Sequence, residues 1–470
     1  MSKKKILFVV NHSAQLRAPF FLIKALQKHS LFNPVVYLNY TSRNLDKELQ
    51  LCITEKINYL LDSVGRKHVE ANSKNPATST TKISIKEATD NKSTGQKIKS
   101  MILKIKIVIL WRYYLNEIKE AKKILTDNAI KAVVLPEDAS PEYGGFFVKA
   151  CSQLNIPSVL LPFTLSNHQE TLYTHGNTVI NSIGERLFCL IFPKWKYCFK
   201  GKNYIARSLP VAIATVLSGL SPKNPWLLMG GNSSFFITEN KLINDYYIKN
   251  GLTATKFIEL GNVYEDVIFN QIQNFEKNRA ALIEKYNLDA NKSIMLCGLH
   301  PVYQDYNEKV DPFYGFETVG EMTDFWIQEM VNCDSFNVLI HCHPRTIPEK
   351  VNYIQQFGVK IVSGDIAEFL PFCDVYVSAT SATIRMAIAC GKPVLIYTMN
   401  FDFDDYINFP GVITTKKKNE FVDCLQKINN DKRYLQNLEK ELKEFVKDKI
   451  NIDGKAKERF INFFEKNIPD

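Results

Sequence analysis

Short apolar runs alternate with helically spaced apolar residues along most of the chain. The first run covers 4–10, a helical pattern follows over 18–29, and a second run covers 34–38. The same alternation returns several times before residue 262. Strands that alternate with helices predict parallel sheets with helices on their faces. We therefore expect an α/β protein whose first Rossmann-like, doubly wound domain covers 1–265.

A second series of the same kind follows a helix expected at 266–286. It predicts a second Rossmann-like, doubly wound domain over 266–430, and Lys- and Glu-rich helices are expected over 431–470. A polar tract at 65–99 predicts an insertion in the first domain, and helical spacing resumes at 115–126. The strands expected in the second domain are 293–299, 336–340, 359–362, 375–377 and 394–397, and its helices are 319–331 and 382–389.

Composition narrows the class of protein. The 470 residues are too many for one hydrophobic core, and a hydrophobic share of 45% excludes a disordered chain. The formal net charge of +10 favours an anionic partner, and on this ground nucleic acid, anionic lipid and nucleotide sugars are all consistent. Ten cysteines occur singly, without the spacing of a zinc site or a redox motif, which is typical of a reduced, cytoplasmic protein.

Four hydroxyl side chains follow the strand expected at 375–377. They are Ser378, Thr380, Ser381 and Thr383, and they stand where the next helix is expected to begin. Backbone N–H groups, hydroxyls and the positive end of a helix dipole would then face one spot, which favours an anion. A hydroxyl-rich turn before a helix is also typical of a simple N-cap, and this alternative stays open.

A second polar group ends the strand expected at 336–340. It contains His343, Pro344 and Arg345, and His300 follows the first strand of the same domain. The carboxyl ends of parallel strands meet at one edge of a sheet, where ligands of open α/β sheets bind. We therefore expect these residues and the hydroxyl turn to form a clamp for a nucleotide phosphate. A His-Pro sequence that only opens a solvated loop is the alternative.

These residues resemble a known family. A strand that ends in His343-Pro344, a turn that holds Ser381 and a Gly-Lys-Pro-Val sequence, within two Rossmann-like halves, resemble the GT-B glycosyltransferases. The resemblance is closest to bacterial surface-polysaccharide enzymes that use CMP-activated sugars, of the sialyltransferase, polysialyltransferase and Kdo-transferase type. It is specific over 336–397 and architectural elsewhere. It implies that His343 with Pro344, and Ser381 with Thr380 or Thr383, hold the CMP phosphate.

One difference from UDP-sugar members of this fold bears on which nucleotide carries the donor sugar. The resemblance implies that UDP-sugar members of this fold carry an acidic residue early in the helix before Gly-Lys-Pro. That residue holds the ribose hydroxyls of the nucleotide. The corresponding positions here are Arg385 and Met386. A helix without that carboxylate favours a donor that is held chiefly by its phosphate, and so a CMP-linked donor over a UDP-linked one.

Transfer to an acceptor hydroxyl requires a group that takes the hydroxyl proton. Glu137 and Asp138 directly follow the strand expected at 130–135, and the resemblance implies an acidic motif at this place in the first domain, across the cleft from the donor. We take the two carboxylates jointly as the candidate catalytic base. A turn-forming Pro-Glu-Asp sequence without a chemical role is the alternative. Three histidines near strand ends are candidates for acceptor binding, namely His12, His168 and His175.

The expected function is metal-independent transfer of a sialic-acid-like or Kdo-like sugar from a CMP-linked donor to a bacterial surface glycan, such as capsule, lipopolysaccharide or glycoprotein. The expected partners are the nucleotide sugar and the glycan acceptor. No cofactor is expected. Nucleic acid is not expected as a partner, because the sequence has no RNA-binding signature. The Asp402-Phe-Asp404 pair is expected to lie in a loop without an essential metal. Two alternatives stay open: a GT-B transferase with a UDP-sugar, GDP-sugar or CDP-glycerol-type donor, and a non-catalytic nucleotide-sugar-binding protein.

Two stretches are both basic and apolar, 99–114 and 187–200, with aromatic residues between their lysines. Such stretches suit a membrane interface, although core elements with snorkelling lysines have the same composition. No run approaches the roughly eighteen apolar residues of a membrane-spanning helix. We therefore expect a cytoplasmic protein and keep open a peripheral position on the inner face of the cytoplasmic membrane.

Overall fold

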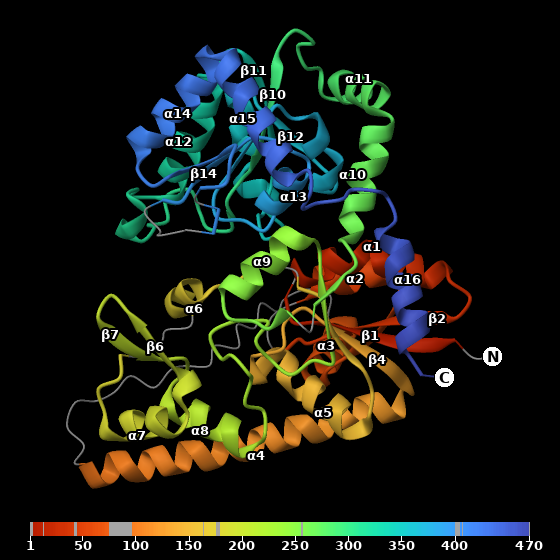
Figure 1. The fold of residues 1–470 in the computed structure, drawn as a ribbon, viewed down its shortest axis with the longest axis vertical. Coiled ribbons are helices and arrows are strands. Elements are labelled where there is room, and N and C mark those ends of the chain that lie inside the picture. The colour runs from red at the N-terminus through yellow and green to blue at the C-terminus, as the bar shows by residue number, and fades with distance from the viewer. Residues whose placement is uncertain are drawn as a thin grey trace. The chain divides into compact units, whose positions relative to one another are not determined.

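A computed structural model of the chain describes residues 3–12, 14–41, 45–74, 96–162, 164–174, 179–254, 257–399, 405–406 and 408–469. The chain divides into two compact units, each with its own parallel sheet (Figure 1). This confirms the expected class of two Rossmann-like α/β domains with C-terminal helices. Unit 1 comprises Met1–Thr238, Ile243–Glu259 and Ile461–Asp470, and unit 2 comprises Glu239–Leu242 and Leu260–Phe460.

In the described part of unit 1, the sheet has seven parallel strands in the order β3-β2-β1-β4-β5-β8-β9. β1 pairs with β2 on one side and with β4 on the other, so the winding of the sheet reverses between β1 and β4. Ligands of open α/β sheets bind beyond the carboxyl ends of the strands at such a reversal. The strands are β1 (Lys4–Val10), β2 (Phe32–Leu38), β3 (Asn58–Leu61), β4 (Ile130–Leu135), β5 (Ser158–Leu160), β8 (Phe235–Thr238) and β9 (Phe257–Glu259).

One helix of unit 1, α4 (Gln96–Asp127), is much longer than the pattern predicts. The basic apolar stretch 99–114 belongs to the same helix as the expected 115–126 segment. The expected insertion begins within α3 (Ser63–Lys74), and its residues 75–95 lie outside the described ranges. The other elements are α1 (Ala14–Lys28), α2 (Asp46–Thr54), η1 (Pro141–Gly145), α5 (Phe146–Leu154), α6 (His168–Thr174), α7 (Ile183–Ile191), η2 (Pro193–Trp195), α8 (Leu209–Leu217), α9 (Lys241–Lys249, mostly in unit 1) and the antiparallel hairpin β6 (Lys196–Phe199) and β7 (Lys202–Ile205).

The second half of α4 packs on the sheet through one face. Tyr114, Ile118, Ala121 and Leu125 recur at spacings of three and four residues, and all four are buried. This spacing places side chains on one side of a helix. Here they join a core cluster that includes Leu7 of β1. Burial of each large apolar side chain stabilises the fold by roughly 1.5–3 kcal/mol, which fixes α4 against the sheet.

In the described part of unit 2, the sheet has six parallel strands in the order β12-β11-β10-β13-β14-β15. β10 pairs with β11 on one side and with β13 on the other, so this sheet reverses between β10 and β13. The strands are β10 (Ser293–Gly298), β11 (Phe336–His341), β12 (Lys360–Val362), β13 (Val375–Ser378), β14 (Val394–Tyr397) and β15 (Val412–Thr415).

Two helices of unit 2 differ from the expected pattern. The single helix predicted over 266–286 is two helices, α10 and α11, because the backbone leaves the helical conformation at Asn274. The helix predicted from residue 382 begins two residues later, after a turn. The helical elements of unit 2 are α10 (Val263–Gln273), α11 (Phe275–Tyr286), η4 (Pro312–Tyr314), α12 (Val319–Val331), η5 (Pro348–Lys350), η6 (Asn352–Phe357), η7 (Ile366–Glu368), η8 (Leu370–Phe372), α13 (Ile384–Ala389), α14 (Lys418–Asn430), α15 (Lys432–Val446) and α16 (Ala456–Asn467), which ends in unit 1.

Aromatic rings form the centre of the core of unit 2. Tyr397 of β14 stacks on Phe421 of α14 with ring centroids 4.9 Å apart, and Trp326 of α12 packs on the same ring at 5.3 Å. All three side chains are almost fully buried. Aromatic pairs add to the energy of simple burial, so these contacts fix α12 and α14 to one face of the sheet.

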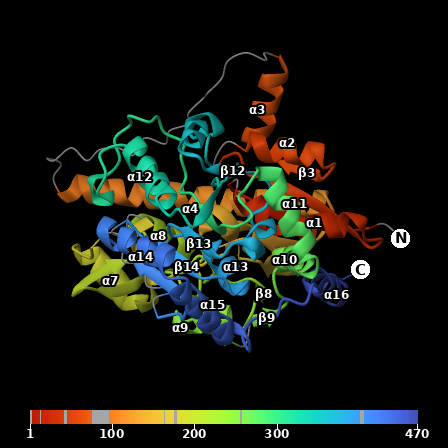
Figure 2. The same ribbon diagram turned by 90° about the horizontal axis from the view of Figure 1, so that it is seen from above.

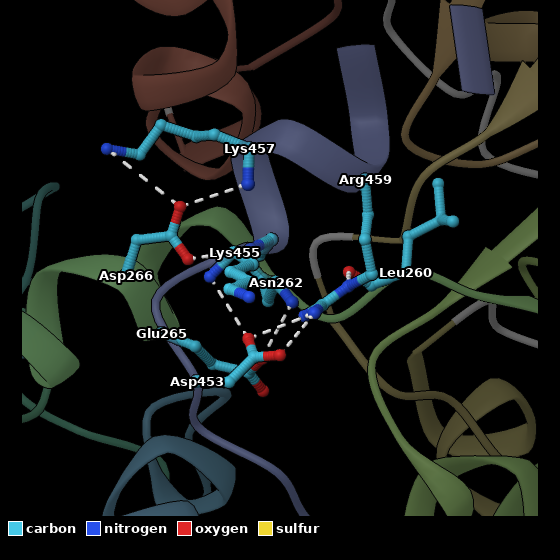
Figure 3. A network of polar contacts seen from close by, with 9 residues as sticks. Leu260, Asn262, Glu265, Asp266, Asp453, Lys455, Lys457 and Arg459 are labelled. Atoms are coloured by element: carbon cyan, nitrogen blue, oxygen red, sulfur yellow. Dashed lines mark hydrogen bonds and ion pairs between the residues drawn. The ribbon is translucent and has the colours of Figure 1, made fainter. Parts of the chain in front are cut away.

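A polar network ties the start of α16 to α10 (Figure 3). The Asp266 carboxylate of α10 accepts hydrogen bonds from the backbone N–H groups of Ala456 (2.8 Å) and Lys457 (3.0 Å). These groups belong to the first turn of α16, where a helix lacks internal partners, so Asp266 acts as a cap supplied by another helix. Arg459 Nη1 adds contacts to both carboxylate oxygens of Asp453, at 2.9 and 2.7 Å.

We expect Asp266→Asn to destabilise the protein by about 1–3 kcal/mol, because the amide turns a donor toward a buried backbone N–H group. Asp431→Asn is the matched control. Asp431 caps α15 at the surface by accepting the N–H of Tyr434 (2.9 Å), and asparagine caps a helix equally well. The midpoints of urea unfolding measure the difference, and equal midpoints for the two variants would contradict the role given to Asp266.

Candidate active site

The nucleotide-binding candidates of unit 2 lie where its sheet reverses. In the parallel register, Gly298 at the end of β10 stands opposite His341 of β11 on one side and Ser378 of β13 on the other. The loops after β11 and β13, which carry the expected phosphate-binding groups, therefore leave the sheet on either side of the loop that carries His300. Residues from three strand ends thus gather at one edge of one sheet.

The loops after β10 and β11 are tied together by hydrogen bonds. The Val302 N–H group donates to Thr346 Oγ1 (3.1 Å), and the Ile347 N–H group donates to the Val302 carbonyl oxygen (2.9 Å). Thr346 is buried, and its own N–H group donates to the His343 carbonyl oxygen (2.8 Å). These contacts hold the segment with His343, Pro344 and Arg345 against the rest of unit 2.

The two histidines at the end of β11 have different surroundings. His341 is buried, and its Nε2 lies 3.1 Å from the Gly364 carbonyl oxygen, so a neutral ring uses its proton within the fold. His343 is half-buried, and its Nδ1 accepts the backbone N–H group of Arg345 at 3.1 Å. A neutral His343 ring therefore carries its proton on Nε2. The Arg345 side chain is exposed at the same loop.

His300 is a buried, neutral histidine. Its Nε2 lies 3.3 Å from Thr323 Oγ1, and this hydroxyl donates to the Val319 carbonyl oxygen (2.8 Å), so the His300 proton sits on Nε2. Burial lowers the pKa of His300 to about 4. The ring also packs edge-on against Trp326 with centroids 5.7 Å apart. His300 therefore offers a neutral ring rather than a cation at this edge of the sheet.

Hydroxyl groups cluster in the turn after β13. Tyr376 Oη forms a hydrogen bond with Thr383 Oγ1, which lies 2.8 Å from Ser381 Oγ. Thr383 is thus shared between a core tyrosine and the turn, and this fixes the position of the half-buried Ser381. Thr380 is exposed. Because α13 has only six residues, its dipole is short, and hydroxyls and backbone N–H groups are the main donors of this turn.

A glycine makes room for this cluster. A Cβ atom at Gly298 would lie 2.1 Å from the Tyr376 hydroxyl oxygen, a distance that no side chain can occupy. Ser378 is buried beside them and donates to the Gly298 carbonyl oxygen (3.3 Å). β10 and β13 can therefore approach with the tyrosine hydroxyl between them.

Arg385 stands in α13 at the position where UDP-sugar members of the GT-B fold are expected to carry an acidic residue, and it forms a buried ion pair. Its Nε lies 3.1 Å from Oε1 of Glu239, and the two side chains are 5% and 9% exposed. Asn262 Nδ2 (2.7 Å) and Tyr264 Oη (2.9 Å) donate to the same oxygen. A carboxylate therefore does lie beside α13, although it comes from another part of the chain.

In unit 1, Glu137 lies where the sheet reverses, between the ends of β4 and β1. Gln15 of α1 connects these ends: the Asn11 N–H group donates to Gln15 Oε1 (2.7 Å), and Gln15 Nε2 donates to Glu137 Oε1 (3.0 Å). Asn11 Oδ1 accepts a further hydrogen bond from Asn39 Nδ2 (2.9 Å). Glu137 thus belongs to a chain of oriented hydrogen bonds. Sequence reasoning missed Gln15, because its place in a helix carries no signal.

Asp138 anchors a loop. Its Oδ1 accepts the Gly231 N–H group (2.8 Å), and its Oδ2 accepts the Ser233 N–H group (3.0 Å). A Cβ atom at Gly231 would lie 2.2 Å from the Asp138 carbonyl oxygen, so only glycine fits there. Both carboxylate oxygens of Asp138 are therefore engaged by backbone groups of one loop, whereas Glu137 is oriented through a side chain.

A cavity of about 240 Å³ opens beside this loop in unit 1. Asp138, Lys223 and Asn224 line its polar side, and Leu160 and Phe236 line its apolar side. The cavity lies at the carboxyl end of β5, beside the loop that Asp138 holds. It offers a small mixed surface near the candidate carboxylates.

Two of the three histidines proposed for acceptor binding lie in the described part of the chain. His12 is half-buried directly after β1. His168 begins α6 and stacks on Tyr197 with centroids 5.1 Å apart; burial lowers the pKa of His168, and a hydrogen bond with Asn250 opposes this shift. Within the described residues, no three His, Cys, Asp or Glu side chains are arranged to hold a metal ion. His175, Asp402 and Asp404 lie outside the described ranges.

The chain is similar in fold to solved structures of nucleotide-dependent enzymes. A Staphylococcus aureus MnaA structure with UDP is 13% identical with a TM-score of 0.50, and the match covers 99% of this chain and 98% of that one. A UDP-GlcNAc 2-epimerase from Neisseria meningitidis bound to UDP-GlcNAc is 13% identical with a TM-score of 0.50, covering 99% and 100%. A wall teichoic acid polymerase TagF variant soaked with CDP-glycerol is 11% identical with a TM-score of 0.50, covering 99% and 88%.

No family model and no curated protein matches the sequence. At 11–13% identity, the similarity to solved structures concerns the fold. The chain therefore has a GT-B-like fold, which is shared by epimerases and transferases.

We expect Asp138→Asn to lower the thermal midpoint more than Glu137→Gln. In Asp138→Asn, an NH2 group replaces one of the two carboxylate oxygens and faces a buried backbone N–H group. This should lower the free energy of unfolding by about 1–3 kcal/mol. At position 137, glutamine keeps an oxygen that can accept from Gln15 Nε2. Differential scanning calorimetry of the two variants measures the difference. An equal or larger drop for Glu137→Gln would show that Asp138 is not the anchor.

Proposed function

We propose that the protein transfers a group from a pyrimidine-nucleotide donor to an acceptor hydroxyl, with unit 2 as the nucleotide-binding unit. The observation that carries this proposal is the meeting of three strand ends around Gly298, which puts the His343 loop and the Ser381 turn on either side of one point. Two loops that both present donors match the needs of a phosphate group. The ligands named with the similar structures, UDP, UDP-GlcNAc and CDP-glycerol, support a pyrimidine nucleotide.

The phosphate-binding roles follow from the donors of each loop. His343 carries its proton on Nε2 when neutral, and Arg345 contributes a permanent positive charge. Ser381 and Thr383 contribute hydroxyls from the opposite loop. Negative charge develops on the leaving phosphate during transfer, and preorganised donors stabilise it without reorganisation. In this proposal the four residues lower the barrier by holding that charge.

A UDP- or CDP-linked donor is the first candidate. It is supported by the ligands named with the similar structures. A CMP-linked, sialic-acid-like or Kdo-like sugar is the second candidate. It is favoured by the resemblance of the His343-Pro344 sequence and the Ser381 turn to CMP-sugar enzymes. In either case we propose a surface glycan or wall polymer as the acceptor, with no essential metal.

We propose Glu137 as the group that takes the acceptor proton. Its carboxylate lies at the reversal of the unit 1 sheet and is oriented by Gln15. Asp138 is the weaker candidate, because two backbone N–H groups already engage its oxygens. A sugar hydroxyl is a weak nucleophile until a base accepts its proton, so this carboxylate sets the rate of transfer.

We expect His343→Ala to weaken nucleotide binding by about tenfold or more, the equivalent of a lost charge-assisted contact of roughly 1.5–3 kcal/mol. His341→Ala is the matched control, since His341 uses its proton on the Gly364 carbonyl oxygen. Calorimetric titration of wild type and both variants with CMP, CDP, UDP and GDP measures the affinities and ranks the donors. If His343→Ala binds the preferred nucleotide as tightly as wild type does, the phosphate site lies elsewhere.

We expect transfer to continue in EDTA and to fall by about two to four orders of magnitude in Glu137→Gln, with nucleotide affinity nearly unchanged. The hydrogen-bond donors of unit 2 stabilise the negative charge of the leaving phosphate without a cation. The acceptor hydroxyl still needs a base to take its proton. Turnover with the preferred nucleotide donor is measured for wild type, Glu137→Gln and Asp138→Asn. Complete loss in EDTA, or full activity of Glu137→Gln, rules out this mechanism. Nucleotide binding without transfer favours the non-catalytic alternative, and an epimerised donor sugar favours an epimerase.

A further inference from the structure

Helix α7 is apolar on its exposed side. Phe188 and Cys189 are buried in a core cluster of unit 1 and fix the inner side of the helix. Four large apolar residues, spaced by four, three and one positions, lie on the outer side, so the core of unit 1 does not account for them. They are Ile183, Leu187, Leu190 and Ile191, with 77%, 55%, 79% and 69% of their surface exposed.

The first half of α4 has the same character. Leu103 packs into the core cluster that also contains residues of α7, so the two helices are neighbours. Figure 1 shows α7 near the N-terminal part of α4, and Figure 2 shows α8 labelled between the two helices. The side of α4 that faces away from Leu103 carries Met101, Ile105 and Ile109, which are 57%, 50% and 61% exposed. A helix half that exposes several large apolar side chains is typical of a surface that another apolar surface covers.

Positive charge is concentrated in the same two segments. Residues 96–116 and 186–207 together hold 11 of the 59 Lys and Arg residues and none of the 49 Asp and Glu residues. The rest of the chain, with 48 basic and 49 acidic residues, is therefore close to neutral. In the hairpin that follows α7, Lys196, Lys200 and Lys202 are exposed. The two segments thus carry a net charge of +11, against −1 for the rest of the chain.

We propose that this surface, formed by the outer sides of α4 and α7 and the β6-β7 hairpin, binds an anionic lipid bilayer. A bilayer interface takes up apolar side chains and attracts lysines without needing a specific partner for each one. A second copy of the chain is disfavoured, because two such surfaces would bring like charges together. No helix in the described residues is long and apolar enough to cross a membrane. The helices would lie in the plane of the interface.

One tryptophan reports on this surface. The chain has four tryptophans, and Trp111 of α4 is 37% exposed, whereas Trp195, Trp226 and Trp326 are at most 2% exposed. Entry of Trp111 into the interface should shift its emission to shorter wavelength. The full-length protein is titrated with vesicles of phosphatidylcholine alone and of phosphatidylcholine with phosphatidylglycerol. We expect a blue shift and co-flotation only with the anionic vesicles, and both effects should weaken as salt rises.

Leu190→Ser combined with Ile191→Ser should reduce vesicle partitioning about tenfold or more per residue, since each side chain would otherwise be transferred from water into the interface. Leu31→Ser with Ile53→Ser is the matched control; these residues are 41% and 49% exposed and lie on other elements of unit 1. Because every substituted side chain is exposed, the fold should persist, and the thermal midpoint checks this. Equal partitioning of the two double variants would overturn the proposal.

A triple variant, Lys196→Gln, Lys200→Gln and Lys202→Gln, tests the charge separately. Each lysine near an anionic surface should contribute about fivefold to partitioning. This variant also decides the case if the apolar variants unfold. The proposal would be overturned if the wild-type protein does not bind anionic vesicles, or if it self-associates through Leu190 and Ile191 instead. Nucleotide affinity of unit 2 should be unchanged in all variants, so failure here leaves the proposed function intact.

Discussion

The close approach of β10 and β13 at Gly298 is the constraint on which the candidate nucleotide site depends. The Tyr376 hydroxyl fills the space where a side chain at position 298 would stand, and it fixes Thr383 and, through it, Ser381. On the other side of β10, the register with β11 sets where the His343 loop begins. A larger residue at 298 would displace the Tyr376 hydroxyl and with it its hydrogen bond to Thr383. The geometry of the phosphate site is therefore a property of the sheet and not of either loop alone.

Buried carboxylates in this protein are satisfied in two ways, and the difference separates structural from chemical candidates. Asp138 and Asp266 each accept two backbone N–H groups, and both hold a segment that is distant in sequence. Glu137 and Glu239 each accept hydrogen bonds from side chains, Glu137 from Gln15 and Glu239 from Asn262, and Glu239 also pairs with Arg385. A carboxylate whose oxygens are fixed by backbone groups cannot turn toward a substrate without breaking the fold. The side chain of Gln15, which donates to Glu137, can move without breaking the main chain, and this supports the proposal of Glu137 as the proton acceptor.

The strand ends could be predicted from the sequence, because an apolar run followed by polar residues marks the edge of a parallel sheet wherever it occurs. This logic placed His343 and Ser381 correctly at strand ends of one sheet. It also shows why Arg385 and Glu239 could not be paired: they join through tertiary structure, and no local pattern links them. The first half of α4 was missed for another reason. Apolar residues fall on all sides of this segment, between its lysines, so it has no 3.6-residue period, and only the part from residue 115 onward was predicted to be helical.

The distribution of charge has a consequence for how the protein binds anions. Outside the two basic segments of unit 1, the chain is close to neutral, so no strong general field draws a nucleotide to unit 2. Affinity for a phosphate there must come from short-range donors such as His343, Arg345 and Ser381, whose positions the strand register fixes. Short contacts between partly buried groups are screened by salt much less than a diffuse surface charge is. The two proposed anionic ligands should therefore differ in salt dependence: bilayer binding should weaken steeply with ionic strength, and nucleotide binding should weaken little.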